Sequence, residues 1–242
     1  DLRVTDSEPI VFIKEKLQKL KKIKAADVGC GGGRYDLKLF QHLGDKLHLT
    51  CIDSNANMLH ELTKGLNEHE IKNFKTITAP AKELPLEDRS LDAMFTFNAV
   101  HHFKLPDFLE EASRLLRDNG YLFMYTRLRS QNKINIWGRF FPGFCEKEKR
   151  LYELDELEDM LEKSPQLELE SVEYFKYKRI AKLERLITQA KNHHYSTLYL
   201  YNEQEFNESL KKFQENITHH YKNTGNITWN DENVMLIIRK RF

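Results

Sequence analysis

Short apolar runs alternate with segments of helical period through the first half of the chain. The runs lie at Ala25–Val28, Leu47–Ile52, Lys75–Thr78, Leu91–Phe97 and Tyr121–Tyr125. Helical spacing between them is clearest at Leu37–Leu43, Met58–Leu66 and Phe108–Leu116. Strands that alternate with helices predict parallel βαβ units, in which helices cover both faces of the sheet. The strands should then be almost continuously apolar, as the run ending at Phe97 is, so we predict an α/β fold.

The regular alternation ends near Arg127, and the remaining chain has a different pattern. A helix is expected near 153–163, and two late strands are expected at 166–177 and 231–241. Between those strands lies a charged stretch with helical spacing, which we interpret as an inserted lid because it contains no strand signal. The predicted organisation is one domain (1–242) with a core (1–127), an aromatic loop (128–150) and a helical insert or lid (178–222).

Charge and cysteine content weigh against several classes of protein. The 38 Lys and Arg residues nearly balance the 37 Asp and Glu residues, so there is no strong nucleic-acid signal. The three cysteines lack metal-type spacing, and Cys30 and Cys51 lie in apolar stretches, which indicates a reducing, cytoplasmic setting.

Further compositional features bear on location and surface. No apolar run reaches membrane-spanning length, so no membrane is expected as a partner. The start at Asp1 has no signal-peptide pattern and no Met, which suggests a trimmed or truncated start. Charge runs such as Glu146–Arg150 are expected on the solvated surface. The oligomeric state is left open.

A glycine cluster follows the first predicted strand and opens a helix, with the sequence Asp27-Val28-Gly29-Cys30-Gly31-Gly32-Gly33-Arg34. Glycine is needed where a backbone turns sharply and lets a ligand approach closely. A dinucleotide site is disfavoured, since Arg34 stands where the third glycine of that motif would fall. The carboxylate of Asp27 would also repel a pyrophosphate.

A second carboxylate, Asp53, ends the next predicted strand. In that place a carboxylate accepts hydrogen bonds from both ribose hydroxyls of an adenosine. The alternative is that Asp53 is only the N-cap of the helix that carries Met58 and Leu62. The neighbouring glycine cluster favours the ribose interpretation.

Five segments in order resemble a class I S-adenosylmethionine-dependent methyltransferase of the Rossmann-like superfamily. They are Asp27–Gly33, Ile52-Asp53, Leu84–Asp92, Phe97–Phe103 and Leu115–Leu122, and the match spans roughly residues 23–127. The resemblance implies a seven-stranded, mostly parallel sheet with helices on both faces, an antiparallel last strand and a helical insert before it. It also implies S-adenosylmethionine as cofactor, bound at the C-terminal ends of the strands.

The same resemblance implies which residues bind the cofactor. Asp27 and the glycines would line the methionine half, Asp53 the ribose, Ala81 and Lys82 the adenine, and Asn98 the methionyl amine through its carbonyl. The full predicted set is Asp27, Gly29, Cys30, Gly31, Gly33, Asp53, Ser54, Met58, Ala81, Lys82, Asn98 and Ala99. The chain departs from the family at Pro80, where many relatives have an Asp that accepts from the adenine amino group. Adenine recognition then depends on the backbone near Ala81, on Glu83 or on stacking.

Candidates for catalysis and acceptor binding are less specific. His101 and His102 follow the fourth strand, where the methyl group should emerge, and a neutral imidazole there would serve as a general base. The alternative is that these histidines only pack or bond to a loop. Trp137, Phe141, Tyr195 and Tyr199 are candidate acceptor contacts, against the alternative that they pack the core. The remaining histidines lack nearby ligands, so no metal site is predicted.

The predicted activity is methyl transfer to an unidentified, small-molecule acceptor. A tRNA or protein methyltransferase is a competing interpretation, since the His-His-Phe element of residues 101–103 also occurs in tRNA-modifying relatives. It would need a basic face, and the lysines of residues 14–24 are equally explained as a solvated helix face. A methyltransferase-like protein that binds the cofactor without turnover is also compatible with the motifs. A nicotinamide oxidoreductase is disfavoured by the glycine cluster.

Overall fold

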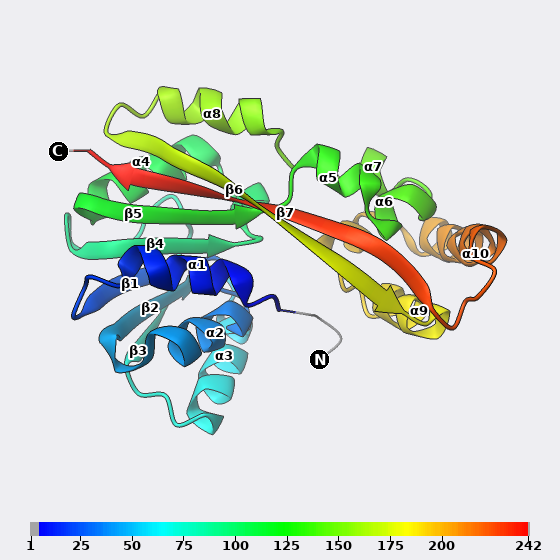
Figure 1. The fold of residues 1–242 in the computed structure, drawn as a ribbon, viewed down its shortest axis with the longest axis horizontal. Helices are drawn as coiled ribbons and strands as arrows, with labels where there is room; N and C mark the ends of the chain where they lie inside the picture. The colour runs from blue at the N-terminus through cyan, green and yellow to red at the C-terminus, as the bar shows by residue number, and fades with distance from the viewer. Residues whose placement is uncertain (1–4, 242) are drawn as a thin grey trace. The chain divides into compact units, whose positions relative to one another are not determined.

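The computed structural model describes residues 5–241, so the predicted trimmed start at Asp1 lies outside the described part. Its sheet has seven strands in the order β3-β2-β1-β4-β5-β7-β6, which confirms the predicted α/β fold (Figure 1). The strands are β1 (Ile23–Val28), β2 (Leu47–Asp53), β3 (Phe74–Thr78), β4 (Leu91–Phe97), β5 (Leu116–Thr126), β6 (Leu167–Ala181) and β7 (Ile227–Lys240).

Helices follow β1, β2 and β4 where the periodicity predicts them, whereas β3 joins β4 through residues 79–90 without a helix. Those of the first half are α1 (Glu8–Leu17), α2 (Arg34–Leu43), η1 (Gly44–Lys46), α3 (Ala56–Glu68), η2 (Val100–His102) and α4 (Leu105–Leu115). Those of the second half are α5 (Arg129–Ile134), α6 (Ile136–Phe140), α7 (Phe144–Lys147), α8 (Leu154–Glu162), α9 (Leu183–Lys191), η3 (Ser196–Leu200) and α10 (Glu203–His220).

Strand directions also follow the prediction. Within the sheet, β1 pairs in parallel with both β2 and β4, β2 with β3, and β4 with β5. The last strand, β7, pairs with β5 in the antiparallel direction, from Tyr121 opposite Arg239 to Thr126 opposite Val234. The carboxyl ends of the parallel strands therefore meet at one edge of the sheet, where the predicted cofactor residues lie.

Contacts divide the described chain into two compact units. The sheet unit comprises Thr5–Thr126, Leu154–Phe175 and the residues from Val234 onward, and the helical unit comprises Arg127–Glu153 and Lys176–Asn233. The boundary falls within β6 and β7, so both strands contribute residues to both units.

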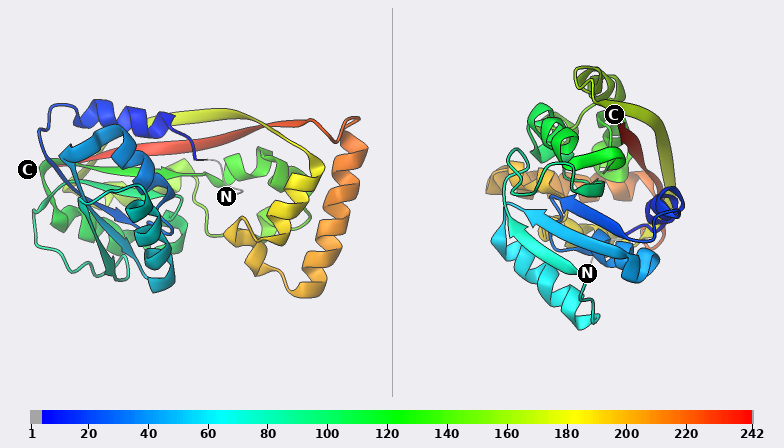
Figure 2. Two further views of the ribbon diagram at one scale, coloured as in Figure 1. Left: turned by 90° about the horizontal axis from the view of Figure 1, so that it is seen from below. Right: turned by 90° about the vertical axis from the view of Figure 1, so that its left-hand side faces the viewer.

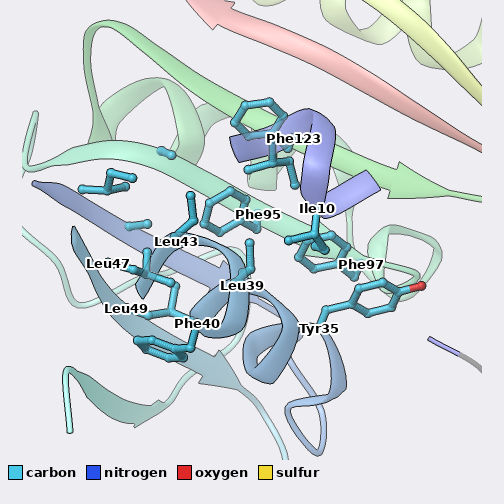
Figure 3. Packing of buried hydrophobic residues seen from close by; sticks show 14 of the residues in the cluster. Ile10, Tyr35, Leu39, Phe40, Leu43, Leu47, Leu49, Phe95, Phe97 and Phe123 are labelled. Atoms are coloured by element: carbon cyan, nitrogen blue, oxygen red, sulfur yellow. The ribbon is translucent and has the colours of Figure 1, made fainter. Parts of the chain in front are cut away.

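Helices cover both faces of the strands of the sheet unit. Helices α1, α2 and α3 supply one hydrophobic cluster with the strands, and α4 packs on β5 and against α8 on the other face (Figure 2). In the cluster, Ile10 and Leu39 approach Phe95 and Phe123, all completely buried (Figure 3). Burying each such side chain contributes about 1.5–3 kcal/mol, which fixes α2 over the sheet.

The helical unit has a separate aromatic core. The segment predicted as an aromatic loop, 128–150, instead contains α5, α6 and α7, because its aromatic side chains recur at helical spacing and pack inward. Trp137 stacks on Phe213 of α10 with a centroid distance of 5.1 Å. These contacts hold the short helices, which would be marginal alone.

Two boundaries and one surface prediction differ from the sequence-based expectation. The late strands are longer than predicted, so residues 178–181 belong to β6 rather than to the insert, and β7 begins at Ile227. Half-buried and exposed residues alternate along β6, so the polar residues at its end were assigned to the insert although they continue the strand. In the charge run 146–150, Glu148 is buried rather than solvated, because it binds Arg150 and accepts from the Thr197 hydroxyl.

Candidate functional site

The turn after β1 is held against the end of β2. The amides of Gly29 and Cys30 both donate to the carbonyl of Ile52, at 2.8 and 3.2 Å. Parallel pairing places Asp27 beside Cys51 on the neighbouring strand. The glycine loop, residues 29–33, therefore opens beside the end of β2 and leads directly into α2, whose N-cap is Gly33.

Glycine is required at positions 29 and 31 for different structural reasons. Both Gly29 and Gly31 are left-handed, with φ of 75° and 55°. A Cβ at Gly29 would lie 2.5 Å from the Cβ of Ala99, so packing against the end of β4 excludes a side chain. A Cβ at Gly31 would meet no heavy atom within 4 Å, so the loop is open at that point.

Asp53 ties the glycine loop to the start of α3. One carboxylate oxygen accepts from the amide of Gly31 and the other from the amide of Asn55, each at 2.9 Å. The side chain of Asn55 caps α3 by accepting from the amide of Asn57, so the alternative that Asp53 is the N-cap is wrong. The half-buried Asp53 carboxylate keeps lone pairs for further donors, while Ser54 and Met58 are exposed beside it.

The end of β3 lies next to Asp53. Thr78 pairs with Asp53 in the sheet, and the amide of Ala79 donates to the Asp53 carbonyl at 3.2 Å. The chain then turns through residues 80–83, where the Glu83 amide donates to the carbonyl of Pro80. Ala81 is half-buried, whereas Lys82 and Glu83 are exposed.

The end of β4 carries a strained residue, Asn98, with φ of 54°. Its amide donates to the carbonyl of Tyr125 at 2.7 Å, and its side chain hydrogen-bonds the hydroxyl of Tyr35. Tyr35 stacks on Phe97 at 4.4 Å, and burial raises the pKa of its hydroxyl to about 12. Strain of this kind concentrates at functional sites. Tyr35 was not predicted from the sequence, where its signal is an aromatic residue in the first helical turn after the loop.

A second residue that the sequence did not reveal is Asp36 in the first turn of α2. Asp27 and Asp36 are 1% and 0% exposed, and within residues 5–241 no group donates a hydrogen bond to either oxygen of Asp27. Burial and the neighbouring Asp36 raise the pKa of Asp27 well above its usual range, and burial raises the pKa of Asp36 to about 7. The signal was an acidic residue on the apolar stripe that continues with Leu39 and Leu43.

The histidine candidates lie on η2, after β4. The ring centroids of His101 and His102 are 4.1 Å apart, with His101 half-buried and His102 exposed. Burial raises the pKa of the Cys30 thiol, in the glycine loop, so it is protonated at neutral pH. Within residues 5–241 no group of three or more His, Cys, Asp or Glu residues is arranged to hold a metal ion.

The four acceptor candidates all lie in the helical unit, in different environments. Trp137 and Phe141 are each 2% exposed and belong to its aromatic core. Tyr195 is half-buried and packs edge-on against Phe144, and Tyr199 is 71% exposed. Packing alone accounts for Trp137 and Phe141. No helix in the described part of the chain combines the length and apolar composition needed to cross a bilayer.

Comparison with protein families finds a match over residues 26–124, to the family described as "Methyltransferase domain". A probable phthiotriol/phenolphthiotriol dimycocerosates methyltransferase 2 of Mycobacterium ulcerans is 30% identical over 115 residues, 47% of this chain and 43% of the relative. A demethylmenaquinone methyltransferase of Listeria welshimeri is 27% identical over 133 residues, 53% of this chain and 55% of the relative. The chain thus spans about half the length of these relatives.

Solved structures match over nearly the whole chain. The YcgJ protein of Bacillus subtilis has a TM-score of 0.65 at 15% identity, covering 98% of this chain and 100% of the other. A Haemonchus contortus phospholethanolamine N-methyltransferase 2, solved in complex with phosphomonomethylethanolamine and S-adenosylhomocysteine, has a TM-score of 0.59 at 13% identity. It covers 97% of this chain and 52% of the other. At these identities the likeness establishes the fold.

Proposed function

We propose that the chain transfers a methyl group from S-adenosylmethionine to a small-molecule acceptor, because residues 26–124 match the methyltransferase domain family and the sheet has the Rossmann-like fold of the matching solved structures. The observation that carries the proposal is the meeting, at one edge of the sheet, of the open glycine loop and the Asp53 carboxylate, joined by the bond from the Gly31 amide. An ordinary tight turn would need neither free space beside Gly31 nor a carboxylate next to it, so these two features favour a ligand site.

The residues present fit S-adenosylmethionine. The Asp53 carboxylate has lone pairs for ribose hydroxyls, and the loop at Gly31 leaves room for a ligand to approach the backbone. The carboxyl of Asp27 is buried at the head of the loop, next to the place where the methionine half would bind. The carbonyl of Asn98, held by its strained backbone, is suited to accept from an ammonium group.

S-Adenosylmethionine, when bound, supplies a methyl group on a positively charged sulfur. The chain's own residues then have to align an acceptor with that group and exclude water. Alignment alone lowers the activation barrier by about 7–11 kcal/mol. An acceptor that is already nucleophilic needs no base. For a hydroxyl acceptor, His101 or His102 would remove the proton from its oxygen.

Support for a small acceptor comes from the relatives, whose names specify small molecules and neither a nucleic acid nor a protein. The balanced charge of the chain, 38 basic against 37 acidic residues, agrees with that choice. We assign acceptor specificity to the helical unit, with the exposed Tyr199 and the half-buried Tyr195 as contact candidates. A cytoplasmic setting is part of the same proposal.

Titration calorimetry with S-adenosylmethionine and, separately, with reduced nicotinamide dinucleotide tests the cofactor. Binding of the first but not the second supports the proposal, and the reverse would reject it. Transfer of a radiolabelled methyl group is then measured on a panel of quinols, fatty acids and small amines, with tRNA and protein mixtures alongside. Labelling of tRNA or protein alone would favour a macromolecular acceptor. Binding without transfer to any of these would favour a protein without turnover.

A further inference from the structure

Two buried carboxyl groups meet beside the glycine loop. Asp27 lies on β1 and is paired directly with Cys51 on β2, so both side chains face the same side of the sheet. Helix α2 covers that side and brings Asp36 against both of them. The thiol of Cys51 donates to one Asp36 oxygen at 3.4 Å, so the pairing of Asp27 with Cys51 brings both carboxyls to the same thiol.

These two carboxyls cannot both be ionised. Two adjacent carboxylates buried at 1% and 0% exposure repel each other and lack solvation. Within residues 5–241, no N–H or hydroxyl group donates to either oxygen of Asp27. The pair therefore holds at least one proton in the ligand-free protein.

The surroundings decide which carboxyl ionises more easily. The titratable groups that face the pair are Cys30 in the loop and Cys51 and Asp53 on β2, all of them acids, and β4 contributes the apolar Phe95. Asp36 is the third residue of α2, where the positive end of the helix and a backbone hydrogen bond favour a carboxylate. Asp36 is therefore the member that becomes the anion when positive charge arrives.

We propose that Asp36 is a positioning residue for the cofactor, acting through Asp27: the pair gives up a proton to solvent when the cationic methionine half of S-adenosylmethionine binds at the glycine loop. The inference rests on the proposed function and adds to it a residue outside the methyltransferase motifs. Asp27 stands two residues before Gly29, and Asp36 three residues after Gly33, so the pair flanks the loop on both sides. A cation at the loop stabilises the ionised pair, so affinity rises with pH through the neutral range.

The experiment is titration calorimetry of the full chain with S-adenosylmethionine at pH 6.5, in two buffers that differ in heat of ionisation. We expect the apparent binding enthalpy to differ between the two buffers. The difference, divided by the difference in the buffers' heats of ionisation, should correspond to the release of about half a proton to one proton. The dissociation constant should fall with pH from 5.5 to 7.5, by at most about tenfold per unit for one proton. Equal enthalpies in the two buffers would overturn the inference without touching the proposed function, whereas absence of any binding would remove the proposed function itself.

The matched variants are Asp36→Asn and Asp45→Asn. The first keeps the shape of the side chain and a donor toward Asp27, and should move the midpoint of the pH dependence by more than one pH unit. The second removes the same charge from an exposed position on η1 and should leave the wild-type profile. A wild-type profile in Asp36→Asn would contradict the assignment. Should that variant not fold, the wild-type measurement in two buffers decides the question alone.

Discussion

Gly29 lies directly against Ala99, so that a Cβ at Gly29 would come within 2.5 Å of the Cβ of Ala99. This contact joins the turn after β1 to the end of β4, two places that are seventy residues apart in the sequence. A change at Gly29 therefore acts on both sides of the candidate site at once.

Alanine substitutions along the glycine loop should separate packing from ligand binding. Gly29→Ala introduces the collision with Ala99 and a left-handed alanine, which alone costs about 1–2 kcal/mol, so the protein should be clearly less stable. In Gly31→Ala the new Cβ meets no neighbouring atom, so the free energy of unfolding should fall only by the cost of a left-handed alanine. Binding of S-adenosylmethionine should nevertheless weaken strongly. Urea denaturation and calorimetry measure the two effects. Equal loss of binding in Gly32→Ala, whose Cβ also meets nothing, would contradict the special role of Gly31.

Replacing Asp53 should weaken the cofactor complex. Asp53→Ala removes a charged acceptor for ribose and also the acceptor of the Gly31 amide, so the binding free energy should fall by about 1–3 kcal/mol. Asp53→Asn, which keeps a neutral acceptor, should lose less. Calorimetry with S-adenosylhomocysteine measures both, and wild-type affinity in Asp53→Ala would rule out a ribose contact.

The hydroxyl of Tyr35 should matter more than its ring for cofactor binding. Tyr35→Phe retains the stacking on Phe97 but loses the hydrogen bonds to Asn98 and Tyr125, at a cost of about 0.5–1.5 kcal/mol in unfolding free energy. Because Asn98 is then less well held in its strained conformation, S-adenosylmethionine should bind more weakly. Tyr121→Phe, which removes a half-buried hydroxyl elsewhere in the sheet unit, is the control. If both variants bind equally, Tyr35 has no positioning role.

Stability should depend on pH through Asp36. Burial raises the pKa of Asp36 from the ordinary 3.8 to about 7, so the folded protein binds this proton more tightly than the unfolded chain. Its contribution is fully present below about pH 4 and is lost as pH rises through about 7. Asp36→Asn cannot titrate, so its stability relative to wild type should improve by roughly 2–4 kcal/mol between pH 4 and pH 8. Urea denaturation at both pH values measures this difference, and a constant difference would contradict it.

Two aromatic residues of the helical unit should behave oppositely. Trp137 is 2% exposed and stacked on Phe213, so Trp137→Ala should destabilise the protein by about 3–5 kcal/mol. Tyr199 is 71% exposed, so Tyr199→Ala should change stability by less than about 0.5 kcal/mol. If Tyr199 contacts the acceptor, the KM for that acceptor should rise while cofactor affinity stays constant. An unchanged KM would leave Tyr199 with no part in acceptor binding.

The sequence by itself determined the sheet, the glycine loop and the place of Asp53. These follow from local rules: apolar runs alternate with helical periods, glycines stand where the backbone must be left-handed, and a carboxylate ends the second strand. The antiparallel last strand came from the ordered resemblance over residues 23–127, and the strand pairing confirms it. The strand pattern and the glycine loop are encoded by residues close together in the sequence, so they could be predicted without knowledge of packing.

Only the tertiary structure decided which side chains meet. Asp36 looked like an ordinary acidic residue of a first helical turn, and its contact with Asp27 arises because α2 packs over β1 and β2. Trp137 lies in a segment whose sequence resembles a loop, and its stacking partner, Phe213, is 76 residues away in the sequence. Tyr35 lies next to Asn98 because β4 pairs with β1 in the sheet. Such contacts depend on strand order and helix packing, which periodicity in one segment does not encode.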